Sequence, residues 1–227
     1  MLEGLSSGRL VGTFVKLPAL ESIDLCAASL DFCVVDHEHS QLSEADVLHL
    51  VRHAAAIGFP TVVRIPEVDR GLANRLLEAG AAGIQLSSVR RVSEVRALRE
   101  AALYAPDGRR SISLAHPAAR YGATPLRDYL AGVERPLLVA QLETRETDDP
   151  LDDICAAGAD VVFLGLTDLL VDCGLDETAA RERADAIASA AQRAGVMLGG
   201  FGNEERFRYA VVSSDVALLR EAVARVR

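Results

Sequence analysis

The chain has 227 residues and a net charge of −9 at pH 7, and half of its residues are hydrophobic. This length and composition suit one large α/β domain of an ordinary globular protein. An acidic surface repels phosphate backbones and anionic lipids, so we expect neither nucleic acid nor a membrane as partner, although a local arginine can still bind a small anion. Aromatic residues make up only 4% and Trp is absent, which predicts an aliphatic core.

The four cysteines show neither a C-x-x-C pair nor zinc-finger spacing, so we expect buried, reduced thiols. They are Cys26, Cys33, Cys155 and Cys173. No stretch of 18 residues is apolar throughout, and the first residues lack the basic and apolar regions of a signal peptide. Together these features predict a cytoplasmic protein.

Eight short apolar runs, most of them rich in β-branched residues, recur along the chain. Most are continuously apolar rather than alternating, as expected for parallel strands that are covered on both faces. The runs are Leu10–Leu17, Phe32–Asp36, Thr61–Ile65, Gly83–Ser88, Leu137–Glu143, Val161–Gly165, Val196–Phe201 and Ala210–Ser214.

Amphipathic stretches lie between these runs and predict helices over Leu42–Ile57, Asp69–Ala79, Val92–Leu103 and Glu177–Ala194. Strand and helix alternating eight times predict a single α/β domain over residues 1–227, a (β/α)8 TIM barrel. A doubly wound open sheet is the structural alternative. No G-x-G-x-x-G motif follows the first strand, which argues against a dinucleotide-binding version of that sheet.

The connection from Arg90 to Pro136 is longer than one helix requires. A long connection after a barrel strand often covers the active site or forms a subunit contact. A plain surface excursion fits the sequence equally well.

Polar side chains stand at the ends of four apolar runs. Such residues are costly to place there unless they are paired or functional. Because barrel chemistry gathers where the strands end, they are candidates for an active site. They are Asp36 to His39, Arg64, Gln141 to Glu143, and Thr167 and Asp168.

Glu143 and Asp168 are 25 residues apart, which is one strand–helix unit, so neighbouring strands would place both carboxylates at the barrel mouth. Two carboxylates suit a hard divalent cation such as Mg²⁺ or Mn²⁺, with positions left for water and substrate oxygens. The alternative is a structural ion pair with a nearby arginine.

His39 lies three residues after Asp36, and a carboxylate bonded to one ring nitrogen would make His39 a suitable general base. The alternative is a histidine that only stabilises a loop. Arg64 requires an anion, which could be a substrate carboxylate or enolate, or else Glu38 or Glu143. Lys16 is the only lysine; a Schiff-base role is conceivable, but an ion-paired or solvated lysine is the preferred interpretation.

Seven segments carry a family resemblance: Gly12–Pro18, Asp31–His39, Val62–Pro66, Tyr104–Arg110, Ala118–Gly122, Gln141–Thr144 and Val161–Leu169. In order and spacing they resemble the HpcH/HpaI family of class II, metal-dependent pyruvate aldolases, over nearly the whole chain. The resemblance implies a TIM barrel of the phosphoenolpyruvate/pyruvate-domain type. It also implies an aldehyde-lyase that acts on a 2-oxo acid, such as a 4-hydroxy-2-oxo acid, with an aldehyde as its second small-molecule substrate.

The resemblance implies roles for the residues at the strand ends. Glu143 and Asp168 would hold Mg²⁺ or Mn²⁺, or else Co²⁺, and the metal would stabilise a pyruvate enolate. Arg64 would stabilise the enolate oxygen, and His39, held by Asp36, would act as the base.

Substrate contacts, by the same resemblance, would come from Gln141, the backbone at Thr167, Phe14 and Ser87. Lys16 matches relatives in which it is not a Schiff-base residue.

The chain departs from the family pattern at Ser87, Ser88, Ser111, Leu166 and Leu170. These changes surround the pocket and spare the residues expected to bind the metal and act as base. They leave open a diverged member that uses the same metal enolate for another lyase, hydrolase or cyclisation reaction. A barrel without turnover is the less favoured alternative. Relatives often pack their last helix on a neighbouring subunit, which implies a homo-oligomer, a trimer or hexamer, through residues 216–226.

Overall fold

The structure is a computed structural model that describes residue 4 and residues 8–226. Eight parallel strands form a closed barrel in which each strand pairs with the next and β1 also pairs with β8. This closure confirms the TIM barrel and rules out the open sheet. All eight predicted strands are found, with ends shifted by at most two residues. They are β1 (Leu10–Val15), β2 (Phe32–Asp36), β3 (Thr61–Ile65), β4 (Gly83–Leu86), β5 (Leu137–Leu142), β6 (Val161–Leu164), β7 (Met197–Phe201) and β8 (Tyr209–Ser214).

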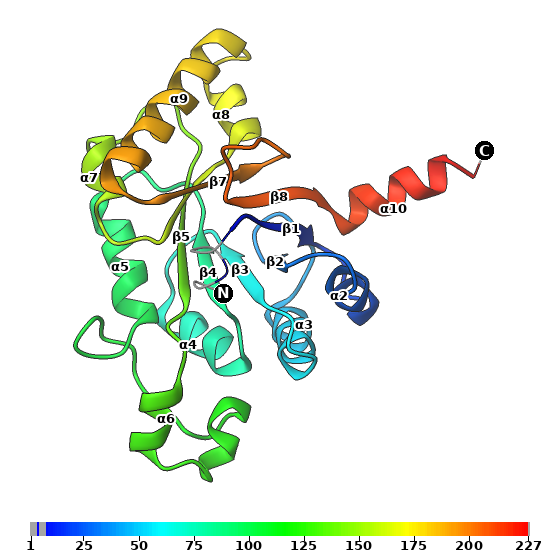
Figure 1. Ribbon diagram of the computed structural model, residues 1–227, viewed down its shortest axis with the longest axis vertical. Coiled ribbons are helices and arrows are strands. Elements are labelled where there is room, and N and C mark those ends of the chain that lie inside the picture. Colours follow the sequence, from blue (N-terminus) through cyan, green and yellow to red (C-terminus); the bar gives the residue numbers. More distant parts are fainter. Residues whose placement is uncertain (1–3, 5–7, 227) are drawn as a thin grey trace.

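Helices surround the barrel, and the four predicted from amphipathic periodicity are all present (Figure 1). Ser43 caps the helix over Glu44–Ala56 through a capping box with Asp46. The helices are α2 (Leu20–Ala27), α3 (Glu44–Ala56), α4 (Arg70–Ala79), α5 (Val92–Ala102), the 3₁₀ helix η1 (Pro117–Gly122), α6 (Leu126–Gly132), α7 (Leu151–Cys155), α8 (Leu166–Asp172), α9 (Glu177–Ala194) and α10 (Asp215–Ala224).

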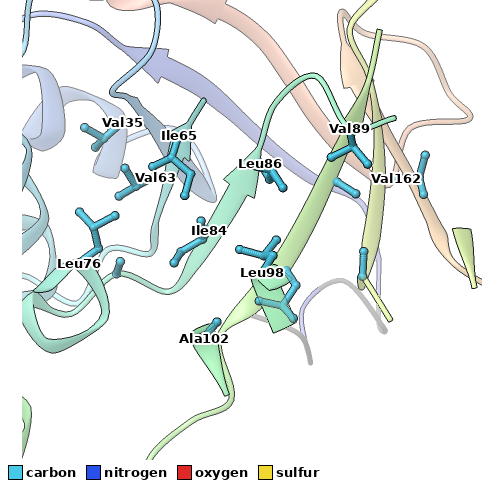
Figure 2. Close-up of a cluster of buried hydrophobic side chains, with 14 of the residues drawn as sticks. Val35, Val63, Ile65, Leu76, Ile84, Leu86, Val89, Leu98, Ala102 and Val162 are labelled. Atoms are coloured by element: carbon cyan, nitrogen blue, oxygen red, sulfur yellow. The ribbon is translucent and has the colours of Figure 1, made fainter. Parts of the chain in front are cut away.

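The core has two layers, one inside the barrel and one between the strands and the helices. The outer layer is almost wholly aliphatic, and Figure 2 shows Leu76 of α4 and Leu98 of α5 among the side chains of β3 and β4. The inner layer contains Val34, Val62 and Val139, together with four of the protein's ten Phe and Tyr residues. All four cysteines are free and buried.

Strand alternation explains why polar residues collect at one end of the barrel. Side chains two residues apart on a strand share a face. Asp36, Arg64 and Gln141 therefore continue the inward rows that begin with buried Val34, Val62 and Val139. Asp36 and Arg64 are also register partners on β2 and β3. These polar side chains therefore lie on the inner faces of the strands, at the carboxyl end of the barrel.

Of the interpretations left open for the long connection, the structure does not support a cover over the strand ends. The extra length of this connection follows α5 and leads through η1 and α6 into the amino end of β5, so it is not a strand-to-helix connection at the mouth. The last helix, α10, extends away from the barrel (Figure 1), and none of its residues is buried. Within the described residues, no helix combines the length and apolarity that a membrane crossing needs.

Candidate active site

The carboxyl end of the barrel brings together most of the predicted site residues. A buried ion network occupies one side of this mouth, between β1, β2 and β3. A carboxylate pair occupies the other side, beyond β5 and β6.

Asp36 is the centre of the ion network and is completely buried. Its carboxylate accepts two hydrogen bonds from Arg64, at 2.9 Å from Nε and 2.7 Å from Nη2, and lies 2.7 Å from Lys16 Nζ. Burial alone would raise the pKa of the Asp36 carboxyl, but the hydrogen bonds and charges of Arg64 and Lys16 hold that pKa well below its usual range. Asp36 is therefore a permanent anion that fixes two cations.

Arg64 is positioned from three directions. Asp36 holds two of its nitrogens, Glu38 lies 3.5 Å from Nε, and the Phe14 ring lies 4.5 Å from the guanidinium carbon. Of the two acidic partners considered for Arg64, Glu38 is confirmed and Glu143 is not. Nη1 makes no hydrogen bond with any described residue, so this nitrogen can donate to an incoming anion.

His39 is placed differently from the expectation. Its side chain is 60% exposed, and its Nε2 lies 3.8 Å from a Glu38 oxygen. Asp36 reaches His39 through the backbone, accepting from its amide at 3.2 Å, and in the described structure it makes no hydrogen bond to the ring. The reason is that Asp36 is buried and committed to Arg64 and Lys16. The ring consequently lies at the surface beside Glu38.

Glu143 follows β5 directly and is 5% exposed. Its Oε1 accepts from both the backbone amide and the hydroxyl of Ser88, each at 2.7 Å, and its Oε2 accepts from the Gln141 amide. Burial raises the pKa of the Glu143 carboxyl, these hydrogen bonds lower it, and the nearby negative charge of Asp168 raises it; the net shift is upward. Glu143 is therefore held in a precise orientation, and its raised pKa means that the surroundings leave a negative charge on it uncompensated, which a bound cation would relieve.

Asp168 lies in the first turn of α8 and is exposed. Within the described residues neither Asp168 nor Glu143 makes an ion pair, so the alternative of a structural pair with an arginine is wrong. The mouth also holds Asp36 and Glu38, so its four carboxylates outnumber the two cations Arg64 and Lys16. This excess of negative charge fits a divalent cation. No group of three His, Cys, Asp or Glu side chains suited to a metal occurs in the described chain.

The predicted substrate-binding residues are spread around the same mouth. Phe14 is 6% exposed and stacks at 6.4 Å on Phe201 of β7. The Ser87 hydroxyl lies 2.7 Å from Glu38 Oε1 and 3.2 Å from the Ile65 carbonyl oxygen. Thr167 is exposed at the start of α8.

Two contributors, Ser88 and Gln85, were not assigned a role from the sequence, and a third, Lys16, was expected only as an ion-paired or solvated lysine. Ser88 was noted only as a departure, yet its backbone has a left-handed φ of 52° and directs two donors at Glu143. Gln85 donates to the Gln141 side chain at 2.6 Å, and its place on the inward row of β4 was the available signal. Lys16, preferred as an ion-paired lysine, does pair with Asp36, and it also donates to the His39 carbonyl at 3.0 Å.

The sequence pattern of the HpcH/HpaI aldolase/citrate lyase family matches residues 11–213. The chain belongs to this family. It is accordingly an enzyme of the lyase class and of the HpcH/HpaI aldolase type.

Named relatives agree with this assignment. The hydroxypyruvate/pyruvate aldolase of Rhizorhabdus wittichii is 32% identical, over 94% of this chain and 90% of the relative. The crystal structure of the HpcH/HpaI aldolase from Desulfitobacterium hafniense DCB-2 superposes with a TM-score of 0.87 at 28% identity, covering 99% of this chain and 93% of that one. The citrate lyase beta subunit from M. tuberculosis, complexed with oxaloacetate and magnesium, shares the fold alone, with a TM-score of 0.57, 18% identity and 93% coverage of each chain.

Proposed function

We propose that the enzyme is a divalent-metal-dependent pyruvate aldolase that cleaves or forms a carbon–carbon bond next to a 2-oxo acid. The observation that carries this proposal is the pair Glu143 and Asp168, two carboxylates at the barrel mouth without any basic partner among the described residues. A relative is named for hydroxypyruvate and pyruvate, and a fold neighbour is complexed with magnesium and oxaloacetate, which is itself a 2-oxo acid.

Glu143 and Asp168 would hold Mg²⁺, Mn²⁺ or Co²⁺. When bound, such an ion supplies a Lewis acid that polarises the 2-oxo group. Ser88 and Gln141 fix the orientation of the Glu143 carboxylate from both of its oxygens, and this prepares the site before any ion enters.

Arg64 would stabilise the oxygen on which negative charge develops. Its Nη1 is the nitrogen that Asp36 leaves without a hydrogen bond, and the ion pair with Asp36 fixes the direction in which it donates. Phe14 stacks on the guanidinium and shields it from water on one side. Gln141 and the backbone at Thr167 would contact the substrate, with Ser87 at the rim.

His39 would move the proton. In the cleavage direction it takes the proton of the substrate's 4-hydroxyl group, directly or through water, while the C3–C4 bond breaks and the aldehyde leaves. The electron pair remains on the pyruvyl fragment beside Arg64, and protonation at C3 completes pyruvate. A ring that is 60% exposed and tethered by its backbone to Asp36 and Lys16 can reach this position without disturbing the ion network.

A Schiff-base mechanism at Lys16 is disfavoured. The ammonium is paired with the buried Asp36 carboxylate, and a protonated amine is not a nucleophile. Borohydride reduction in the presence of pyruvate should therefore give no covalent adduct, and EDTA should inhibit the enzyme.

Exchange of the pyruvate methyl protons with deuterated water tests the proposal. We expect exchange that depends on Mg²⁺ or Mn²⁺ and is lost in Glu143→Gln, a variant that keeps the fold. Exchange without aldol turnover would instead support another reaction of the same 2-oxo acid chemistry. Equal Mn²⁺ affinity in Glu143→Gln would contradict the metal assignment.

We also propose that the enzyme is a homo-oligomer, a trimer or hexamer. Helix α10 leaves the barrel and exposes Val216, Leu219 and Val223, by 45%, 56% and 61% respectively. These residues lie at positions i, i+3 and i+7 and form one apolar stripe that a second copy would cover. Leu219→Glu should lower the mass measured by light scattering, whereas Val171→Glu, at an exposed position of α8, should not. An unchanged mass in Leu219→Glu would refute this role for α10.

A further inference from the structure

Arg110, in the connection after α5, is a buried arginine whose guanidinium has no counterion among the described residues. The residue is 8% exposed, and its Nε and Nη2 are buried without any hydrogen-bond partner. It forms no ion pair with any residue that the structure describes, and the Tyr104 ring lies 4.6 Å from the guanidinium carbon. Burying an unpaired charge is unfavourable, so such a group ordinarily faces an anion.

The chain holds this arginine in a defined loop. The backbone amide of Arg109 donates to the Glu100 carbonyl at 2.8 Å, and that of Arg110 donates to the Leu103 carbonyl at 2.9 Å. Gly108 packs so closely on the end of α5 that a Cβ atom there would lie 2.8 Å from the Arg99 carbonyl oxygen. The loop therefore wraps the last turn of α5 and fixes the direction of the Arg110 side chain.

A cavity of about 230 Å³ opens beside Arg110. Its wall includes Ala102, Tyr104, Leu130, Val133 and Pro136. It is bounded by the end of α5, the segment after α6 and the entry to β5.

The other charged groups of this cavity do not compensate Arg110. Arg135 is paired with Asp160 at 2.8 Å, and Asp107 is paired with Arg99 at 3.0 Å. Glu134 also contributes to the wall, but it is exposed and forms no ion pair with Arg110 in the described structure. The guanidinium is thus the uncompensated charge of the cavity interior.

We propose that this cavity binds a small oxyanion, a phosphate or a short carboxylate, on Arg110. A planar guanidinium fork matches the oxygens of either group, and the volume admits a small ion but not a nucleotide. The site is separate from the candidate active site, because Pro136 precedes β5 and Glu143 follows it, about 23 Å apart along an extended strand. A bound anion would fasten the 103–136 connection to the barrel.

Thermal unfolding with inorganic phosphate or succinate tests this site. At ten times its dissociation constant, either probe should raise the melting temperature by about 3–6 °C. Arg110→Gln should lose that shift, whereas the matched control Arg109→Gln should keep it, because Arg109 is 80% exposed. If only one of the two probes raises the melting temperature, that probe identifies the chemical class of the anion. No shift with either, or an equal shift in Arg110→Gln, overturns the proposal.

A second measurement does not depend on whether the variant folds. Crystals of the parent protein soaked in arsenate should show anomalous density within hydrogen-bond distance of the Arg110 guanidinium. Where phosphate gives the thermal shift, saturating arsenate without a peak at Arg110, including a peak only at the barrel mouth, overturns the proposal. Where only succinate gives the shift, crystals soaked in succinate must show it at Arg110, and its absence there overturns the proposal.

Discussion

Gly165 provides a direct test of how tightly Glu143 is confined. A Cβ atom at Gly165 would lie 2.6 Å from the Glu143 Cβ, closer still to its Oε2, and 3.1 Å from Gln141 Nε2. The φ of Gly165 is −85°, which alanine adopts freely, so any effect of Gly165→Ala must come from this collision and not from backbone strain.

The size of the effect follows from the surroundings. Glu143 is 5% exposed and Ser88 holds its Oε1, so the side chain has little room to move aside. Overpacking of this kind costs typically about 1–3 kcal/mol. In a domain of this size that corresponds to a fall of roughly 2–12 °C in melting temperature. Displacing a metal-binding carboxylate from its supporting hydrogen bonds should weaken Mn²⁺ affinity by about 10–100-fold.

Titration calorimetry with Mn²⁺ and pyruvate proton exchange on Gly165→Ala measure these effects. Gly132→Ala is the matched control, because nothing lies within 4 Å of a Cβ atom at Gly132 and its φ is not in the left-handed region. Parent-like Mn²⁺ affinity in Gly165→Ala would refute the reasoning that a confined Glu143 is a metal ligand.

Four further variants test the roles of residues at the carboxyl end of the barrel. His39→Ala should lower turnover by about 10²–10⁴-fold without loss of Mn²⁺ binding; normal exchange per folded molecule would make His39 a structural residue. Asp36→Asn should destabilise the fold by about 3–5 kcal/mol in urea unfolding at neutral pH, because it leaves Arg64 buried without its anion; since the pKa of Asp36 is lowered in the fold, its contribution should disappear as pH falls below the ordinary value of 3.8. The pKa of Glu143 is raised above 4.5, so the metal-free fold binds that proton more tightly than the unfolded chain does. The free energy of unfolding of the parent should therefore fall relative to that of Glu143→Gln as pH rises above this value. Parallel curves of unfolding free energy against pH for the two proteins would contradict the shift. Ser88→Ala removes one of the two donors to Oε1 and should weaken Mn²⁺ affinity by about tenfold, and an unchanged affinity would limit Ser88 to its backbone amide.

The sequence by itself determined the barrel and most of its mouth. Continuous apolar runs alternating with amphipathic stretches are a local signal. A strand buried on both faces gives an unbroken apolar run, and a helix buried on one face gives apolar residues three or four positions apart. Residue order also places Asp36, Arg64 and Glu143 at or just beyond strand ends, and the parallel arrangement brings strand ends together. The weak points were short helices such as α8, whose seven residues carry too little periodicity to be recognised.

Tertiary structure alone decided which partners those residues take. Asp36 precedes His39 by three residues, and this spacing favoured a contact with the imidazole ring. In the fold, parallel register sets Asp36 beside Arg64, and β1 brings Lys16 to the same carboxylate. Two cations within 3 Å attract the Asp36 carboxylate more strongly than one imidazole ring does, so the carboxylate lies inward and the ring outward. Hydrogen-bond partners across strands depend on register and depth of burial, neither of which is encoded in the spacing of residues along one strand.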